Sequence, residues 1–382
     1  MEEKRLTTHL SGRPAQLENA RKNGIKVVGY FPGNYVPEEL IYASGAVPLC
    51  LVQGGEPRRA EAALSLVPGV ICPFARAQIG ERLLKNPYYN MIDMLVAPGT
   101  CQHLKKTAEV WEYQGGLDIF KLGIPHQHVY DYERQYFTDR LKALGDRLQI
   151  LTGNQITGKQ ISEAIDLYNR MRELLRKISM LRAKSPSPVS ALDFVKLNHA
   201  SFLADPVFMV EVLESIYQDL EPSSPTAEND RPRLLLIAPN IGYGDDKVLE
   251  LVAAAGGDIV IEEVCEGVRD YWHGIEPGGD LFESLARGYL TEKLPCAFMR
   301  NSTRQRLDFA LKLIKDFNVA GVIWYELMCC ETYDEEAYFF AREMSERNIP
   351  MLILESDYGA ADTGQLKTRI EAFIEILKGV GG

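Results

Sequence analysis

The chain has 382 residues, of which 46% are hydrophobic and 25% charged, and its formal net charge is −11. This composition is typical of a soluble globular protein, and the length favours two domains over one core. The negative charge argues against nucleic acid or an anionic membrane as a partner, because either would need a basic face. Residues 1–14 contain no apolar run, so we expect no signal peptide, no membrane span and a cytoplasmic protein.

The first part of the chain alternates strands with helices. Helical patterns are predicted to begin near Val36 and near Gln102. Four apolar runs are predicted strands: residues 26–31, 47–52, 92–97 and 119–124. This alternation is typical of βαβ units and a parallel sheet.

The middle of the chain, residues 130–219, has a helical pattern that is broken once, at residues 185–190. Residues 221–232 have the composition of a linker. Beyond them, strands are predicted at residues 234–238, 259–261, 320–324 and 351–354. The predicted fold is α/β, with two doubly wound parallel-sheet (Rossmann-like) domains joined by a helical segment. The predicted divisions are an N-terminal helical extension (1–24), a first α/β domain (25–150), the helical segment and linker (151–230) and a second α/β domain (231–382).

The two α/β parts resemble diverged copies of one unit, and their cysteines occupy matching positions. The second strand of each copy ends near a cysteine, Cys50 and Cys265, and the third near another, Cys101 and either Cys329 or Cys330. Between them, the pattern Cys-x-Phe-x-Arg starts at Cys72 and again at Cys296. We expect these thiols to meet outside the carboxyl ends of the strands. Helix starts after Cys72, Cys101, Cys296 and Cys330 would favour the metal-binding thiolate.

A single cysteine at a strand end is more often part of the core, but six in matched positions favour metal ligation. Zinc is the weaker alternative, because structural zinc sites favour close pairs such as C-x₂-C. Six thiolates gathered from separate loops favour iron–sulfur chemistry. Three polar side chains near strand ends are candidate proton donors for such a site: Glu326, Tyr30 and Tyr325.

Residues 153–159 match the pattern GxxxxGK, but Gln160 stands where a phosphate-binding loop needs Ser or Thr. The motif also lies between helical stretches and does not follow a strand. We interpret it as a helix entry capped by Thr157. The chain is therefore not expected to bind a nucleotide itself.

Four segments together resemble the D-component superfamily of 2-hydroxyacyl-CoA dehydratases and benzoyl-CoA reductases. They are GYFPGNYVPEELIYASGAVP, ICPFARAQIG, MLVAPGTCQHLKKTAEVWE and PMLILESDYGAADTGQLKTRIEAFIE. The resemblance covers nearly the whole chain. It implies that Cys72, Cys101 and Cys330 bind a [4Fe–4S] cluster, and that a separate ATP-hydrolysing iron–sulfur activator delivers single electrons.

The chain also carries Cys50, Cys265 and Cys296, which depart from the common pattern of that superfamily. In this it resembles the homodimeric double-cubane branch, in which six cysteines hold two sulfide-bridged [4Fe–4S] units, an [8Fe–9S] cluster. The resemblance implies a low-potential reductase of small molecules, with Cys329 not a ligand. Two alternatives stay open: a 2-hydroxyacyl-CoA dehydratase subunit with a single cubane, and a non-enzymatic electron or cluster carrier.

Overall fold

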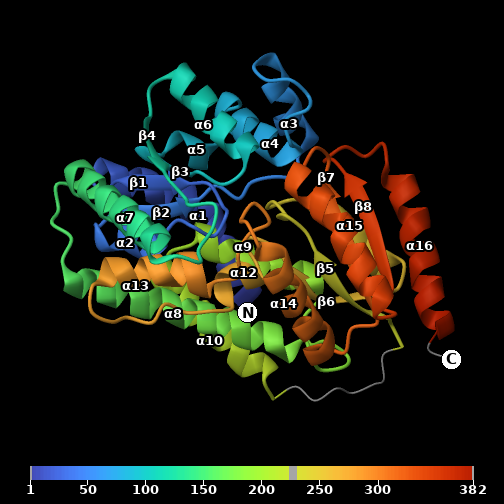
Figure 1. The fold of residues 1–382 in the computed structure, drawn as a ribbon. Helices are drawn as coiled ribbons and strands as arrows, with labels where there is room; N and C mark the ends of the chain where they lie inside the picture. The colour runs from blue at the N-terminus through green and yellow to red at the C-terminus, as the bar shows by residue number, and fades with distance from the viewer. Residues whose placement is uncertain (1, 223–229, 381–382) are drawn as a thin grey trace.

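Two separate four-stranded parallel sheets organise the computed structural model, which describes residues 2–222 and 230–380 (Figure 1). The first sheet has the order β2-β1-β3-β4 and the second the order β6-β5-β7-β8. The strands are β1 (Val27–Tyr30), β2 (Val47–Cys50), β3 (Met94–Pro98), β4 (Asp118–Leu122), β5 (Arg233–Ile237), β6 (Asp258–Glu263), β7 (Gly321–Leu327) and β8 (Met351–Ser356). The predicted fold class is therefore confirmed, and the shared strand order agrees with a repeated unit.

The central strands are buried along their whole length because helices cover both faces of each sheet. Every residue of β1, β3, β5 and β7 is buried. A strand covered on both faces has no polar side to alternate with, which explains the continuous apolar runs of the sequence. Pro48 lies in β2, an edge strand, where a missing backbone N–H costs no hydrogen bond within the sheet.

Helices flank both sheets. Those of the first half are α2 (Glu38–Ala43), α3 (Pro57–Ala62), α4 (Pro73–Leu83), α5 (Pro87–Asn90) and α6 (Gln102–Gln114). Those of the second half are α11 (Lys247–Ala254), α12 (Val268–Tyr271), α13 (Leu281–Arg287), α14 (Ser302–Asp316), α15 (Glu331–Glu346) and α16 (Thr363–Val380). Each α/β unit thus has the layered form that places sites at the carboxyl ends of its strands.

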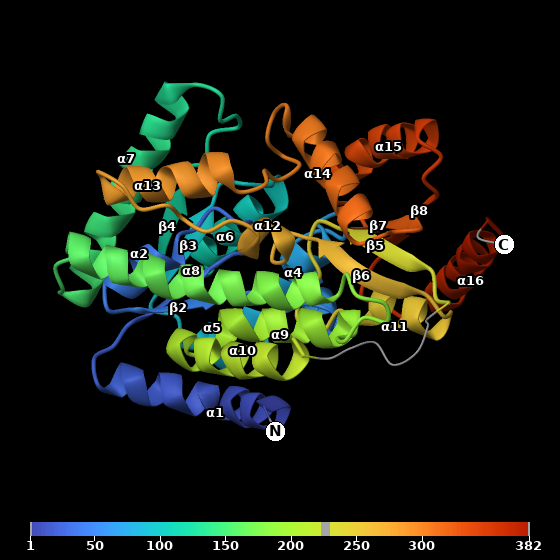
Figure 2. The ribbon, with the colours of Figure 1, turned by 90° about the horizontal axis from the view of Figure 1, so that it is seen from below.

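Long helices make up the segment between the two sheets, as predicted. Figure 2 shows α8, α9 and α10 running side by side, with α1 beneath them. Their bounds are α1 (Glu2–Lys22), α7 (Asp131–Thr152), α8 (Gly158–Leu181), α9 (Ala191–Leu203) and α10 (Pro206–Leu220). The helix α9 contacts both β2 and β6, so it joins the two halves. Residues 223–229 of the predicted linker lie outside the described residues.

The GxxxxGK segment is a helix entry, as predicted. Thr157 is the N-cap of α8, and its hydroxyl accepts a hydrogen bond from the Gln160 backbone N–H at 3.3 Å. The Gln160 side chain accepts in turn from the Thr157 backbone N–H at 2.9 Å. The two bonds form a capping box, which explains Gln160 at this position.

The two halves touch directly where a chain segment after β2 crosses one after β5. Gln53 and Tyr243 form an isolated parallel bridge. The Gly54 backbone N–H donates to the Tyr243 carbonyl at 3.0 Å, and the Tyr243 N–H donates to the Val52 carbonyl at 2.6 Å. A Cβ on Gly242 would lie 2.8 Å from the Gly54 Cα, so glycine is needed at this crossing. The contact fixes the carboxyl ends of the two sheets relative to each other.

Candidate functional site

Three cysteines stand at helix N-termini that follow the sheets. Cys72 is the N-cap of α4, Cys101 of α6 and Cys330 of α15. The Cys101 sulfur accepts a hydrogen bond from the Leu104 backbone N–H at 3.4 Å. Pro73 takes the first helical position after Cys72, where its missing N–H costs nothing. Each of these thiols thus lies beside the positive end of a helix dipole.

Cys50 and Cys265 lie at the ends of equivalent strands. Cys50 is the last residue of β2. Cys265 follows β6, and its backbone N–H donates to the Pro239 carbonyl at 3.2 Å. The strand-end positions expected from the repeat are therefore present in both halves.

The expectation that a helix begins directly after Cys296 is wrong. A turn follows this cysteine, and α14 begins only at Ser302. Asn301 has a left-handed backbone (φ 61°), and the Arg300 backbone N–H donates to the His126 carbonyl at 2.7 Å. This tie to a loop of the first half holds the chain out of helical geometry. No helix dipole therefore acts on the Cys296 thiol.

Five of the six predicted ligands line one cavity of about 80 Å³ between the two halves. Pro32 and Phe74 from the first half and Phe298 and Tyr333 from the second complete much of its apolar wall. The five thiols are those of Cys72, Cys101, Cys265, Cys296 and Cys330. We call this space the cysteine cavity. The structure thus brings together thiols that are up to 258 residues apart in the sequence.

The sixth predicted ligand, Cys50, lines a neighbouring pocket that shares Pro32, Gly33 and Cys265 with the cysteine cavity. Cys329 lines neither space; its backbone is left-handed, with φ at 65°. Within residues 2–222 and 230–380, no group of three or more His, Cys, Asp or Glu side chains is arranged to hold a metal ion. The assignment of the six cysteines as ligands stays a prediction.

Burial of the side chain raises the pKa of each thiol at a helix start, although the residues are partly exposed. Burial raises the pKa of Cys72 to about 12, although hydrogen bonds from the backbone of Ala75 and Phe74 oppose the shift. Burial also raises the pKa of Cys330 well above its usual range, and the charges of Cys72 and Cys101 raise it further. Because this shift depends on burial in an apolar space, a bound cation would reverse it.

Cys296 differs from the others. Its pKa is lowered to about 6, chiefly by a hydrogen bond from the Cys265 thiol, with a smaller contribution from the Arg269 guanidinium. Cys265 correspondingly has its pKa raised well above its usual range, first by this bond and then by burial. The two thiols are therefore coupled, and the interaction lowers the pKa of Cys296 while it raises that of Cys265.

A network of buried ion pairs lies behind this pair. The Arg269 Nε lies 3.1 Å from a Glu263 carboxylate oxygen, and its Nη2 donates to the Ala238 and Pro239 carbonyls at 2.7 and 2.9 Å. Arg306 pairs with the other Glu263 oxygen at 3.1 Å and donates to the Tyr333 hydroxyl at 3.0 Å. Sequence reasoning missed these residues; the only available signal was the position of Arg269, four residues after Cys265.

Tyr30, a predicted proton donor, lies in the pocket that Cys50 lines. Its hydroxyl donates to the Glu38 carboxyl. Burial, followed by the charge of Asp270, raises the pKa of Glu38 to about 8. A neutral carboxyl and a tyrosine therefore stand beside Cys50 at pH 7. Glu38 was not predicted, because it reads in the sequence as an ordinary first-turn helix residue.

The other two predicted donors are not brought to the cysteine cavity. Tyr325 and Glu326 line neither the cavity nor the Cys50 pocket. They are consecutive residues of β7 and so point to opposite faces of its sheet. Glu326 accepts from the Trp324 indole N–H at 3.4 Å, and burial raises its pKa to about 7. Their catalytic roles stay predictions without support from this geometry.

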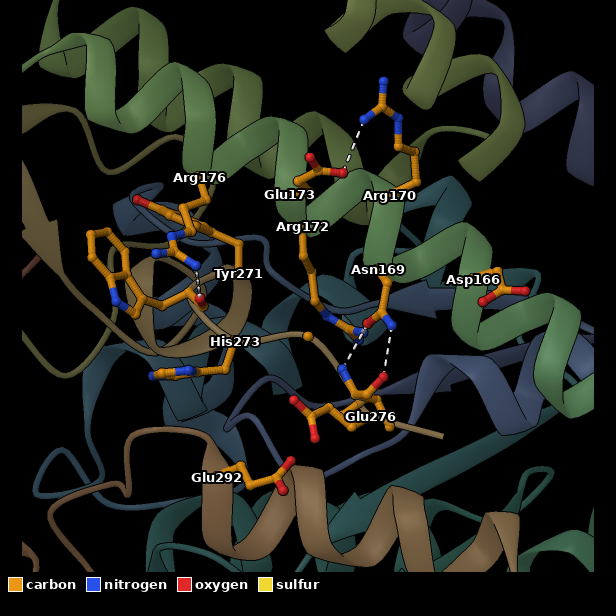
Figure 3. Close-up of a pocket in the computed structure, with 13 residues that line it drawn as sticks. Asp166, Asn169, Arg170, Arg172, Glu173, Arg176, Tyr271, His273, Glu276 and Glu292 are labelled. Carbon is orange, nitrogen blue, oxygen red and sulfur yellow. Dashed lines mark hydrogen bonds and ion pairs between the residues drawn. The ribbon is translucent and has the colours of Figure 1, made fainter. Parts of the chain in front are cut away.

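A larger surface pocket of about 840 Å³ lies over α8 and contains none of the predicted site residues (Figure 3). The Asn169 side chain ties the loop after α12 to α8, donating to the Ile275 carbonyl and accepting from its N–H, both at 2.7 Å. Arg176 stacks over Trp272 at 5.1 Å. Three arginines and four carboxylates line the pocket, so it shows no dominant charge.

Comparison with known proteins agrees with this architecture. The family model for the D-component of 2-hydroxyglutaryl-CoA dehydratase matches residues 34–377. The chain belongs to this family, whose relatives are named as subunits of enzymes. In the described part of the chain, no helix is long and apolar enough to cross a membrane.

Three relatives align over almost their full length. YjiM of Escherichia coli strain K12, a candidate dehydratase subunit, is 28% identical over 94% of this chain and 93% of its own. One subunit of benzoyl-CoA reductase from Thauera aromatica is 22% identical over 92% of this chain and 91% of its own length. The beta subunit of (R)-2-hydroxyglutaryl-CoA dehydratase from Acidaminococcus fermentans is 22% identical over 94% of this chain and 95% of its own length. The relatives include both dehydratases and a reductase, so a reductase or dehydratase role fits this chain.

Proposed function

We propose that this protein is a low-potential iron–sulfur reductase of small molecules. The observation that carries the proposal is the cysteine cavity, in which five thiols from both halves surround one buried space. Thiolates are the ligands that bind iron–sulfur clusters. A cluster contains several irons, so its ligands are spread around a cavity and do not all converge on one point, as they do around a single metal ion. The donor set and its apolar surroundings therefore fit such a group.

The thiols divide into two sets that correspond to two cubanes. Cys72, Cys101 and Cys330 form the first set, because each is the N-cap of a helix and all three line the cysteine cavity. Cys265 and Cys296 form a hydrogen-bonded pair, and Cys50 shares a pocket with Cys265. Each set takes cysteines from both halves. We infer a bridged [8Fe–9S] cluster that joins the halves, in which Cys329 has no part.

When bound, the cluster supplies single electrons at low potential. The chain supplies a buried, mostly apolar space that limits access of water to the thiols. On the side of Cys50 it also supplies the Tyr30 hydroxyl, held by Glu38, as a proton donor. We further propose a homodimer and a separate ATP-hydrolysing iron–sulfur activator as electron donor. Tight ATP binding by the purified chain alone would contradict this division of labour.

A second candidate is a 2-hydroxyacyl-CoA dehydratase subunit with one cubane on Cys72, Cys101 and Cys330. Its support is the separate pocket of Cys50, together with relatives named as dehydratase subunits.

Anaerobic quantitation separates the two candidates. The protein is purified without oxygen, and iron and acid-labile sulfide are measured per chain. The double-cubane proposal expects about eight irons and nine sulfides, and the single-cubane candidate about four of each. A chain that takes up no iron under reconstitution would contradict both.

A further inference from the structure

The cysteine cavity has one polar side chain whose hydrogen-bonding capacity is unused. Asn240 lines the cavity and is 9% exposed. In the described part of the chain, its side-chain Nδ2 is buried and has no hydrogen-bond partner. Leaving a buried amide N–H without a hydrogen-bond partner is unfavourable. Such a group in a native site calls for a partner that the protein chain does not provide.

Asn240 is held against the Cys265 side of the cavity by backbone contacts. The Ala238 N–H donates to the Glu263 carbonyl at 3.1 Å, and the Cys265 N–H donates to the Pro239 carbonyl at 3.2 Å. The Ile241 N–H donates to the Glu266 carboxylate. These bonds lie on both sides of Asn240 and fix its turn beside Cys265. The amide is therefore pre-positioned.

The equivalent turn of the first half offers no such group. Pro32-Gly33 and Pro239-Asn240 follow the first strand of their halves, and both line the cavity. Gly33 has no side chain, so the first half contributes only backbone at this point. Backbone donors reach the cysteines of both halves, such as the Leu104 N–H at Cys101 and the Tyr333 N–H at Cys330. The amide donor is specific to the second half.

We propose that the Asn240 amide donates an N–H···S hydrogen bond to sulfur in the cysteine cavity and thereby raises the reduction potential of the group held there. The inference rests on the proposed function, since it needs an iron–sulfur cluster as the acceptor. Sulfur carries more negative charge in the reduced cluster, so a donor stabilises the reduced form more than the oxidised form. Asn240 is a positioning residue in this role and not a ligand.

The test uses the full chain, purified anaerobically, with Asn240→Leu as the variant of similar volume that lacks the donor. Iron and sulfide are quantified first, and the midpoint potential is then measured by a redox titration followed by electron paramagnetic resonance. We expect unchanged iron content and a more negative potential. At a fixed solution potential the ratio of reduced to oxidised cluster should fall about tenfold, which corresponds to a shift in midpoint potential of about 59 mV for one electron. Asn240→Asp, which also adds a negative charge, should make the midpoint potential still more negative.

Asn198→Leu is the matched control. Asn198 is also buried, but its Nδ2 donates to the Glu266 carbonyl and the residue does not line the cavity. Its loss should leave the potential unchanged. An Asn240→Leu protein with full iron and the wild-type potential would overturn this inference alone. If both Asn240 variants lost iron while Asn198→Leu kept it, the residue would serve cluster retention, and the inference would also fail. A wild-type chain without iron would overturn the proposed function itself.

Discussion

The two halves of the molecule share a strand order, but their cysteines lie in different local environments. In the first half, Cys72 and Cys101 each cap a helix. In the second half, only Cys330 does so, while Cys265 and Cys296 hydrogen-bond to each other with Arg269 nearby. The repeated fold thus fixes where the thiols lie. Burial raises the pKa of the helix-start thiols, whereas the neighbouring Cys265 lowers that of Cys296.

This difference suggests that the two sets of thiols have different chemical roles. Thiols that burial keeps neutral are inert until a metal binds, whereas a thiolate at pH 7 can react first. If iron binds to these cysteines, we expect Cys296, whose pKa is the lowered one, to react before the helix-start cysteines.

The largest effect is expected from the helix-start set. Cys101→Ser should lose at least half of the iron and all reductase activity, because the set of three would no longer hold its cubane. Cys329→Ser is the matched control, since Cys329 lines neither the cavity nor the Cys50 pocket. It should keep its iron. The measurement is iron per chain after anaerobic purification. If Cys329→Ser lost iron while Cys330→Ser kept it, the wrong member of the pair would have been assigned.

Cys50 gives the sharpest division between the two candidate functions. Cys50→Ser should lower iron content by about half if the second cubane depends on it, and Cys265→Ser should do the same. Full iron in both variants would leave only the single-cubane dehydratase subunit.

The apoprotein should show the asymmetry directly as a difference in thiol reactivity. Cys296, with a pKa of about 6, is mostly thiolate at pH 7, while Cys72, with a pKa of about 12, is almost entirely neutral. Both are partly exposed. Iodoacetamide should modify Cys296 at least about a hundredfold faster, as followed by peptide mass spectrometry. Arg269→Gln should reduce that difference, and equal rates would mean that the two thiols have similar environments.

The sequence predicted the eight strands and the meeting of the cysteines because both depend on local patterns. Apolar runs identify buried strands, and parallel strands end at one edge of their sheet. The Cys-x-Phe-x-Arg pattern at Cys296 matches the one at Cys72, so the sequence did not reveal that a turn, bonded to the distant His126 loop, follows Cys296 in place of a helix. Asn240 and Glu38 were missed for a related reason. Their roles arise only where the two halves meet, and no spacing in the sequence marks them.

The predicted donors show the limit of strand-end reasoning. Tyr30 lies beside Cys50, but Tyr325 and Glu326 do not line the cavity although they also lie near the end of a strand. A residue near the carboxyl end of a strand lies at the edge of the sheet where the site is found. Tyr325 and Glu326 point to opposite faces of their sheet and neither lines the cavity, so a position near a strand end does not by itself place a residue in the site.

Each half also buries a carboxyl group after its first strand. The smallest predicted effect is the influence of these two groups on the pH dependence of the free energy of unfolding. Burial raises the pKa of Glu38 to about 8 and that of Asp245 to about 7. The folded protein keeps protons that the unfolded chain releases above about pH 4, so the free energy of unfolding should fall as pH rises from about 4 to 7. One such group gives a slope of up to about 1.4 kcal/mol per pH unit.

Asp245→Asn should remove the contribution of one group to this slope, measured by urea unfolding of anaerobic samples at pH 5, 6 and 7. Glu38→Gln should do the same in the first half and extend the effect to about pH 8. If only one variant reduced the pH dependence of the free energy of unfolding, the two halves would differ in their buried acids as they do in their thiols. The halves would then share the positions of these residues but not their protonation.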